Sequence, residues 1–395
     1  MPPADILLTE NSRLEGVALD ADEADMLRRS GLVEISPAWE PGHYSLTARP
    51  VVGRIALPRR SVVLRPKARL ANLFTMLARL AGRPHLHVDR DALAEYAEGD
   101  AALLGLVDLY LQALDAYLAA GLRRRPTPVT EATPFVRGKL LLTPTLRQPP
   151  ARRHRPVTQR TEWSADTLVN QLLKQAARVA RHTLATTHHP RLSLARELDQ
   201  ALVHLNTVSN TNHPESAFDH VHLNRLEGDA APALVLARWL VAGCAPALDP
   251  GDRPFPVFWL DVARLFEAFV ARLLRDELDA QVTAQRALPL DQAEQVSLRP
   301  DVVVQRRGGR PLVLDTKYKL PGPPQPGDLY QLLTYCQALG AAHGGLVYPA
   351  PTATPPLIVR QSSLTVHALA LDLGAPPADF ATACARFLAE ASALL

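Results

Sequence analysis

Cysteine is nearly absent from this chain of 395 residues. The three cysteines, Cys244, Cys336 and Cys384, lie far apart, and none belongs to a Cys-x-x-Cys pair. This spacing excludes a zinc knuckle and a disulfide framework, and it favours a reducing, cytoplasmic location.

Long apolar runs are missing as well. Residues 1–16 lack the basic segment and apolar core of a signal peptide, and the most apolar later run, 232–248, is short and contains Arg238. We therefore expect neither export nor a membrane-spanning segment.

The chain has little excess of either charge. It carries 43 basic and 40 acidic side chains, a formal net charge of +3. A nucleic-acid surface must therefore come from local clustering. One basic segment fits this requirement, and it either follows a phosphate backbone or is a solvated linker. Its arginines are Arg147, Arg152, Arg153, Arg155 and Arg160, and because no aromatic residues alternate with them, the stacking platform of a single-strand binder is excluded.

The order of predicted elements indicates a multidomain chain of the α+β or α/β class. We predict a β-rich N-terminal domain with helices over 1–160, a helical segment over 161–250 and a C-terminal domain over 251–395, in which helices flank a mixed sheet. Strands are predicted at 44–46, 51–57, 61–64, 139–142 and 345–348. Helices are predicted at 71–81, 101–122, 164–183 with Ser164 as N-cap, 191–205, 231–244, 261–278, 328–339 and 378–395.

Lysine is scarce too, since arginine supplies most of the positive charge. Two of the five lysines, Lys317 and Lys319, lie in one short stretch, SLRPDVVVQRRGGRPLVLDTKYK at 297–319. Arginine stays protonated, whereas the pKa of a lysine can move when it is buried. A site of proton chemistry could therefore require lysine where the rest of the chain uses arginine. Chance also produces such pairs.

This stretch predicts a β-hairpin with acidic residues on both arms. Asp315 and Lys317 share one side of their strand because side chains alternate. Asp301 joins them only if the loop has an odd length and is centred on Gly308, for example 307–309. A two-residue Gly-Gly turn would place the two carboxylates on opposite faces.

Two converging carboxylates with a free main-chain carbonyl suit Mg²⁺, which takes few protein oxygens and keeps several waters. Lys317 would then position or deprotonate the attacking water, or stabilise the negative charge on a pentavalent phosphorus. The alternative is a hairpin whose polar residues simply face solvent.

Two helices contribute further candidate residues. Gln331 and Tyr335 share a flank of the predicted helix 328–339, and Glu267 lies at the edge of the apolar stripe of 261–278. These residues could face the hairpin and complete a site. They also fit a surface amide, a tyrosine at the edge of a core and a solvated glutamate.

Together these residues resemble the PD-(D/E)XK nuclease superfamily. The matching motifs are Pro300-Asp301, Asp315-Thr316-Lys317 and the QxxxY pair Gln331 and Tyr335. Longer stretches look like the McrC family, the nuclease subunit of McrBC-type modification-dependent restriction systems. They are VVGRIALPRRSVVLRPK, NLFTML, RGKLLLTPTLR, SADTLVNQLLK, LFEAFVARLL, RPDVVV, LDTKYK and DLYQLLTYC, and they cover most of the chain.

The resemblance implies roles for seven residues in a Mg²⁺-dependent site, with Mn²⁺ as the alternative metal. The metal ligands would be Asp301, Asp315, the carbonyl of Thr316 and, as an accessory ligand, Glu267. Lys317 would be the catalytic lysine, supported by Gln331 and Tyr335. The implied fold is the PD-(D/E)XK nuclease fold in the C-terminal domain.

The resemblance also implies partners. The family works with McrB, a AAA+ GTPase that recognises modified cytosine, translocates on double-stranded DNA and requires the nuclease subunit for cleavage. The only Gly-Lys pair here, Gly138-Lys139, is followed by Leu140, so the phosphate-binding motif GxxxxGK[ST] is absent. We therefore expect the GTPase to be another chain that contacts the N-terminal half. Cutting two antiparallel strands takes two hydrolyses, and two-fold symmetry is the simplest way to present identical sites to them, so we also expect two copies to pair through the nuclease domain on DNA.

Two alternative functions stay open: a standalone defence nuclease of the same superfamily, and a catalytically inactive adaptor for the GTPase. Acyl-transfer chemistry has no support because no GxSxG motif is present. The histidines do not predict a metal site, because they lack cysteine neighbours and HExxH spacing. These histidines are His188, His189, His213, His220 and His222.

Overall fold

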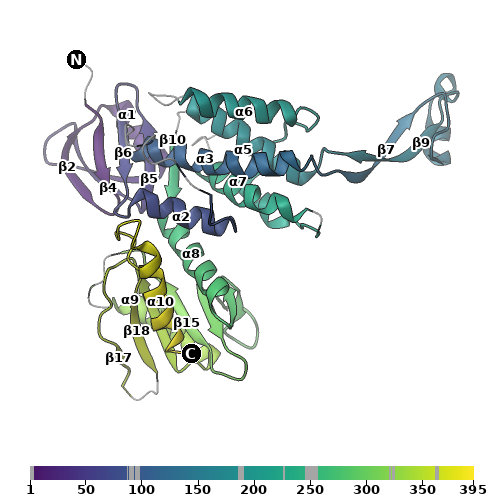
Figure 1. Cartoon of the computed structure of the whole chain (residues 1–395). Helices are drawn as coiled ribbons and strands as arrows, with labels where there is room; N and C mark the ends of the chain where they lie inside the picture. The colour runs from purple at the N-terminus through teal and green to yellow at the C-terminus, as the bar shows by residue number, and fades with distance from the viewer. Residues whose placement is uncertain are drawn as a thin grey trace. The chain divides into compact units, whose positions relative to one another are not determined.

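The computed structural model of the chain is shown in Figure 1. It describes residues 4–86, 88, 93, 98–185, 191–225, 227–244, 257–319, 322, 325–360 and 364–395. The chain forms two compact units. One consists of Met1–Leu109, Thr183–Arg191 and Ala242–Leu395, and the other of Tyr110–His182 and Leu192–Val241. The boundary predicted near residue 250 lies outside the described residues, and the division into three domains stays a prediction.

The first unit begins with two small sheets. One has the order β1-β6-β5-β10 and the other the order β2-β4-β3. The strands are β1 (Ile6–Thr9), β2 (Arg13–Ala18), β3 (Val33–Pro37), β4 (His43–Ala48), β5 (Val51–Ala56), β6 (Ser61–Arg65) and β10 (Val257–Asp261). The strands predicted at 44–46, 51–57 and 61–64 are confirmed as β4, β5 and β6.

Helix α1 (Ala21–Ser30) also lies between these strands, and the sequence pattern did not predict it. Its N-terminus is closed by a capping box, in which Asp20 accepts from the main-chain N–H of Glu23 and the Glu23 carboxylate accepts from that of Asp20. The helix is short and mostly polar, with Glu23, Ala24 and Leu27 as its buried residues, so few large apolar side chains mark it in the sequence.

Two helices follow, α2 (Leu70–Leu80) and α3 (Glu98–Ala119), close to the predicted ranges. Gly105 allows α3 to approach Phe74 of α2, since a Cβ there would lie 2.2 Å from the phenyl ring. The stretch Gly99–Ala119 is long and apolar enough to cross a membrane, but 72% of its apolar window is buried inside the protein. This burial indicates that the helix is packed in a folded core.

The C-terminal part of the first unit is built on a six-stranded mixed sheet with the order β11-β14-β15-β16-β18-β17. Strands β15, β16 and β18 are parallel, whereas β11, β14 and β17 pair antiparallel with their neighbours. The strands are β11 (Gln281–Ala284), β14 (Val302–Gln305), β15 (Leu312–Thr316), β16 (His343–Tyr348), β17 (Leu357–Ile358) and β18 (Thr365–Ala370), and a separate pair is formed by β12 (Leu288–Pro289) and β13 (Ser297–Leu298).

Three helices accompany this sheet: α8 (Val262–Glu277), α9 (Pro326–Leu339) and α10 (Phe380–Ser392). The apolar face of α9 packs on β15 and β16 through Leu332 and Cys336. Gly344 of β16 makes this contact close, because a Cβ there would lie 2.8 Å from the Cys336 Sγ. Together with the mixed sheet, these helices confirm the predicted mixed α and β class.

The second unit contains the end of α3 with α5 (Leu168–Leu184), α6 (Leu192–His204) and α7 (Ala231–Gly243). The prediction that Ser164 caps α5 is wrong. Ser164 is the last residue of β9 (Val157–Ser164), where it pairs with Arg125, and the helix begins only at Leu168. The hydroxyl of Thr167 accepts from the main-chain N–H of Asn170 and takes over the capping role.

An extended arm, which we define as residues 125–164, projects from the helices of this unit (Figure 1). It consists of the sheet β7-β9-β8, with β7 (Arg125–Ala132) and β8 (Lys139–Leu140), and of helix α4 (Leu142–Arg147). The strand predicted over 139–142 therefore ends at Leu140, because α4 starts at Leu142. The pattern missed β7 because of Pro126 and Pro128, which are tolerated there since β7 is an edge strand.

Candidate active site

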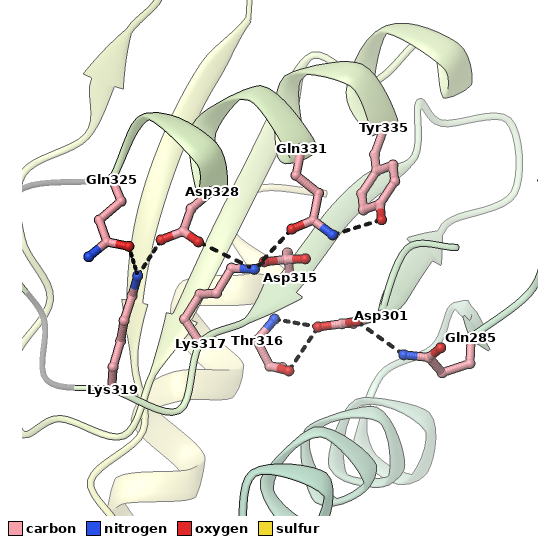
Figure 2. A network of polar contacts seen from close by, with 10 residues as sticks. All are labelled: Gln285, Asp301, Asp315, Thr316, Lys317, Lys319, Gln325, Asp328, Gln331 and Tyr335. Atoms are coloured by element: carbon pink, nitrogen blue, oxygen red, sulfur yellow. Dashed lines mark hydrogen bonds and ion pairs between the residues drawn. The ribbon is translucent and has the colours of Figure 1, made fainter. Parts of the chain in front are cut away.

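The β14–β15 hairpin has the register that brings its two acidic residues together. Val303 lies opposite Val313, so the pairing is centred on Gly308, which has a φ of +77° in the left-handed region that favours glycine. This register confirms the requirement for an odd-length loop. Asp301 and Asp315 consequently face the same side of the hairpin (Figure 2).

Asp301 is held by hydrogen bonds from two other segments. Its Oδ2 accepts from the main-chain N–H of Thr316 at 2.8 Å and from the Thr316 hydroxyl at 2.9 Å. Its Oδ1 accepts from Nε2 of Gln285 at 3.1 Å. These contacts fix the carboxylate at the end of β15, while the metal-binding role of the Thr316 carbonyl stays a prediction.

Asp315 and Lys317 form a buried ion pair. Asp315 is 1% exposed, and its Oδ2 lies 2.7 Å from Nζ of Lys317. Burial raises the pKa of Asp315 to about 6, an effect that Lys317 opposes and Asp301 reinforces. Burial alone would lower the pKa of Lys317, but the contact with Asp315 and the charges of Asp328 and Asp301 raise it overall.

Helix α9 supplies the next polar contacts. Lys317 donates to Oε1 of Gln331 at 3.0 Å, and Nε2 of Gln331 donates to the hydroxyl of Tyr335 at 3.0 Å. The prediction that this flank of the helix faces the hairpin is confirmed (Figure 2). The catalytic roles of these residues stay predictions.

Glu267 on α8 reaches the same region through Gln285. Its Oε1 accepts from Nε2 of Gln285, so one amide group bridges Glu267 and Asp301. Burial raises the pKa of Glu267 to about 6, and the charge of Asp301 adds to the effect. Gln285 has a φ of +52°, a backbone conformation that is uncommon for residues with a Cβ and often found at functional sites.

Four residues of the network in Figure 2 were not assigned a role from the sequence: Gln285, Lys319, Gln325 and Asp328. Asp328 lies in the first turn of α9, where an acidic residue is expected for the helix dipole alone. The scarcity of lysine was the only signal for Lys319. Gln285 carried no signal, since nothing in its neighbourhood indicates a left-handed backbone.

Tyr318 lies between the two lysines in the sequence, and its side chain contacts residues outside the network of Figure 2. Its hydroxyl donates to Oε1 of Glu10 at 2.7 Å, and its ring packs edge-on against Phe266 with 5.9 Å between centroids. Glu10 is fully buried, and burial raises its pKa. The segment that carries Lys317 is thus anchored to the end of β1 and to α8.

The chemistry of the site fits a hard cation. The buried Oδ2 of Asp315 finds no hydrogen-bond donor in the described part of the chain beyond its ion pair with Lys317. Asp315 and Glu267 both resist ionisation, as expected of carboxylates that are buried near other negative charges without a metal. No group of three or more His, Cys, Asp or Glu among the described residues is arranged to hold a metal by itself. Asp301, Asp315 and Glu267 therefore do not form a ready three-carboxylate site, and a Mg²⁺ ion here would take few protein oxygens and keep several waters.

Three of the histidines named from the sequence, His213, His220 and His222, belong to the second unit. Nε2 of His213 lies 2.9 Å from Oε1 of Gln171. His188 and His189 lie outside the described residues.

Comparisons with known proteins agree with the fold and the motifs. Residues 46–349 match the family model described as McrBC 5-methylcytosine restriction system component. No curated protein sequence matches the chain. One similar chain comes from a solved structure of a half-complex from a tetradecameric assembly of Thermococcus gammatolerans McrB AAA+ hexamers with bound McrC. It is 19% identical to this protein with a TM-score of 0.55, and the match covers 99% of this protein and 100% of that chain. The cryo-EM structure of the Thermococcus gammatolerans McrBC complex has 18% identity and a TM-score of 0.43, over 69% of this chain and 87% of that chain.

The first of these structures shares the fold of this chain over nearly its whole length. The family match spans well over half of the residues and includes the β14–β15 hairpin and α9. The chain therefore belongs to the family of McrBC 5-methylcytosine restriction system components.

Proposed function

We propose that this chain is the Mg²⁺-dependent endonuclease subunit of a McrBC-like restriction system and that it hydrolyses DNA phosphodiester bonds. The observation that carries the proposal is the contact of Lys317 with buried Asp315 on the hairpin face that also holds Asp301. We assign the C-terminal part to the PD-(D/E)XK nuclease fold, because a mixed sheet with flanking helices supports this constellation.

The metal would be held by Asp301, Asp315 and the Thr316 carbonyl, with Glu267 as an accessory ligand and Mn²⁺ as an alternative to Mg²⁺. A bound metal would polarise the phosphodiester and lower the pKa of an attacking water. Lys317 would donate hydrogen bonds to the phosphodiester oxygens as negative charge develops on them.

The two α9 residues would act through Lys317. Gln331 accepts from its ammonium, and Tyr335 accepts from the amide of Gln331, so the pair limits where the ammonium can move. This arrangement orients the lysine before DNA arrives, which lowers the cost of reaching the transition state.

The test is cleavage of methylated plasmid by the chain with its GTPase, GTP and Mg²⁺. Asp301→Ala, Asp315→Ala and Lys317→Ala should each lower the cleavage rate by at least about 100-fold, as expected when a preorganised charge is removed. Circular dichroism should show an intact fold. Asp379→Asn, at an exposed carboxylate before α10, is the matched control and should cleave normally. Normal cleavage by Asp315→Ala would overturn the assignment.

We also propose a McrB-like AAA+ GTPase as partner and double-stranded DNA with modified cytosine as substrate. Membership of the McrBC family supports both proposals, and the similar structure contains McrB AAA+ hexamers with bound McrC. Cleavage without any GTPase would instead indicate a standalone nuclease. An intact duplex in the presence of the GTPase, GTP and Mg²⁺ would indicate an inactive adaptor.

The arm offers a surface for the GTPase. Phe135 is 69% exposed and Trp163 is 67% exposed, and Leu142 and Leu146 of α4 are also exposed. Exposed apolar side chains in one region mark interaction sites. Trp163 pairs with Pro126 at the other end of the β7–β9 ladder, so the proposed surface consists of Phe135, Leu142 and Leu146. Phe135→Ser combined with Leu142→Ser should abolish stimulation of GTP hydrolysis. Leu192→Ser, at an equally exposed apolar residue of α6, should not affect it.

Cutting both strands takes two hydrolyses on antiparallel strands, and one copy carries one site, so we propose that the nuclease domain pairs on DNA. A titration that mixes active and Asp315→Ala subunits tests this proposal. Paired sites should turn double-strand breaks into nicks as the inactive fraction rises. If breaks become fewer without nicked circles, one subunit cuts both strands in succession.

A further inference from the structure

One carboxylate, that of Asp328, lies between the two clustered lysines. Its Oδ1 is 3.6 Å from Nζ of Lys317, and its Oδ2 forms an ion pair with Lys319. The Lys319 ammonium also donates to Oε1 of Gln325 at 3.1 Å. The contacts run in one line from Lys319 through Asp328 to Lys317 (Figure 2).

The position of Asp328 in the first turn of α9 does not by itself explain this geometry. An acidic side chain that only complements the helix dipole can remain in solvent. The side chain of Asp328 is 15% exposed, and each of its oxygens faces a different lysine. Two of the five lysines in the chain contact this one carboxylate.

Lys317 needs a second anchor if the proposed function is correct. Its ammonium contacts Asp315, Gln331 and Asp328, and of these Asp315 is also a proposed metal ligand. When the Asp315 carboxylate binds the metal, it contributes less to holding the lysine. A lysine side chain is long and flexible and, unlike arginine, has no rigid planar head group that fixes its orientation. Gln331 is neutral, so Asp328 is the charged anchor that stays with the ammonium.

We propose that Asp328 is a positioning residue for Lys317 and that Lys319 positions Asp328. Lys319, which also donates to Gln325, contacts Oδ2 of the carboxylate, and Oδ1 is directed at Lys317. This inference rests on the proposed nuclease function. It gives roles to two residues beyond the seven that the resemblance assigned.

Kinetics with and without the Asp328 charge test the proposal. Asp328→Asn keeps the size of the side chain, and we expect kcat to fall at least about tenfold, because a displaced catalytic group costs rate rather than substrate binding. The KM for DNA should stay unchanged. The same Asp379→Asn control should leave both constants unchanged.

A double-mutant cycle separates positioning from DNA binding. If Lys319 acts through Asp328, Lys319→Met should lower kcat, and the double variant with Asp328→Asn should be no slower than Asp328→Asn alone. If Lys319 instead binds the DNA backbone, Lys319→Met should raise the KM, and its effect should add to that of Asp328→Asn. The second result overturns the role given to Lys319.

The small number of lysines allows a direct measurement without metal, DNA or turnover. Protein labelled with ¹³C-lysine should give five sets of side-chain signals, which Lys317→Arg and Lys319→Arg assign. Asp328→Asn should shift the signals of Lys317 and Lys319 and leave those of Lys67, Lys139 and Lys174 in place. Asp379→Asn should shift none of them.

The outcomes distinguish this inference from the proposed function. If Lys317→Ala is inactive while Asp328→Asn has wild-type kcat and an unshifted Lys317 signal, only the positioning role fails. If Lys317→Ala itself cleaves normally, the proposed nuclease site fails.

Discussion

Asp301 and Thr316 are joined by two hydrogen bonds, from the main-chain N–H and from the hydroxyl of Thr316 to the same oxygen, Oδ2. The threonine between Asp315 and Lys317 thus fixes the carboxylate of the other hairpin arm. A residue that the motif treats as a variable position therefore has a defined structural contact. Its side chain and its carbonyl can be tested separately.

Thr316→Val removes the hydroxyl and keeps the shape. We expect it to lower the free energy of unfolding by about 1.5–3 kcal/mol, because a hydrogen bond to a charged group is lost. Cleavage should slow, because Asp301 keeps only the main-chain donor of Thr316. Thr316→Ser retains the hydroxyl and should resemble the wild type in urea unfolding and in cleavage assays. Equal behaviour of the two variants would show that the hydroxyl contact is unimportant.

The raised pKa values of Asp315 and Glu267 predict a pH-dependent response to Mg²⁺. Both values lie at about 6, above the ordinary 3.8 and 4.5, so the metal-free fold favours the neutral carboxyl groups. The stability that these groups contribute is present below their ordinary values and is lost as the pH rises through about 6. Because Mg²⁺ binds the charged forms, we expect a larger gain in Tm at pH 8 than at pH 5.

Thermal unfolding in EDTA and in Mg²⁺ measures this difference. Asp315→Asn removes one of the two titrating groups and should reduce both the pH dependence and the gain from Mg²⁺. A gain in Tm that is the same at both pH values, or that survives in Asp315→Asn, would argue against a metal at these carboxylates.

Tyr318→Phe should lower the free energy of unfolding by about 1–3 kcal/mol, because it leaves the buried carboxylate of Glu10 without its hydroxyl donor. Urea denaturation measures the change. Tyr330→Phe, at an exposed tyrosine of α9, is the matched control and should unfold like the wild type. A Tyr318→Phe protein as stable as this control would mean that the Glu10 contact contributes nothing.

Gly344→Ala should push α9 away from β16. The added Cβ would lie 2.8 Å from the Sγ of Cys336 and 3.1 Å from the Cγ of Leu332. We expect a loss of about 1–3 kcal/mol in stability from overpacking, together with slower cleavage, since Gln331 is carried by the displaced helix. Gly327→Ala, in the first turn of α9, meets no atom within 4 Å and serves as the control. Equal unfolding midpoints for the two variants would contradict the prediction.

The parts of the site that could be predicted from the sequence are those set by local periodicity. Strand alternation and the register condition on Gly308 brought Asp301 and Asp315 to one face, and helical spacing placed Gln331 and Tyr335 on one flank. Both patterns depend only on residues within one hairpin or one helix.

The parts that could not be predicted depend on contacts between segments or on the backbone. Gln285 reaches Asp301 from beyond the end of β11 with a left-handed φ, which no periodic pattern encodes. Asp328 meets both lysines only because α9 packs beside β15. Strand β7 of the arm was missed because Pro126 and Pro128 argue against a strand unless it is known to lie at an edge.

The hydrogen bond from Tyr318 to Glu10 determines what a proteolytic fragment of this protein would lose. The residue next to the proposed catalytic lysine takes its hydroxyl partner from β1, at the opposite end of the chain. A proteolytic fragment that keeps the C-terminal sheet but loses the first strands would also lose this support for the Lys317 segment. Such a fragment would therefore carry the proposed nuclease site in a weakened form, so partial degradation would disable the site rather than release it.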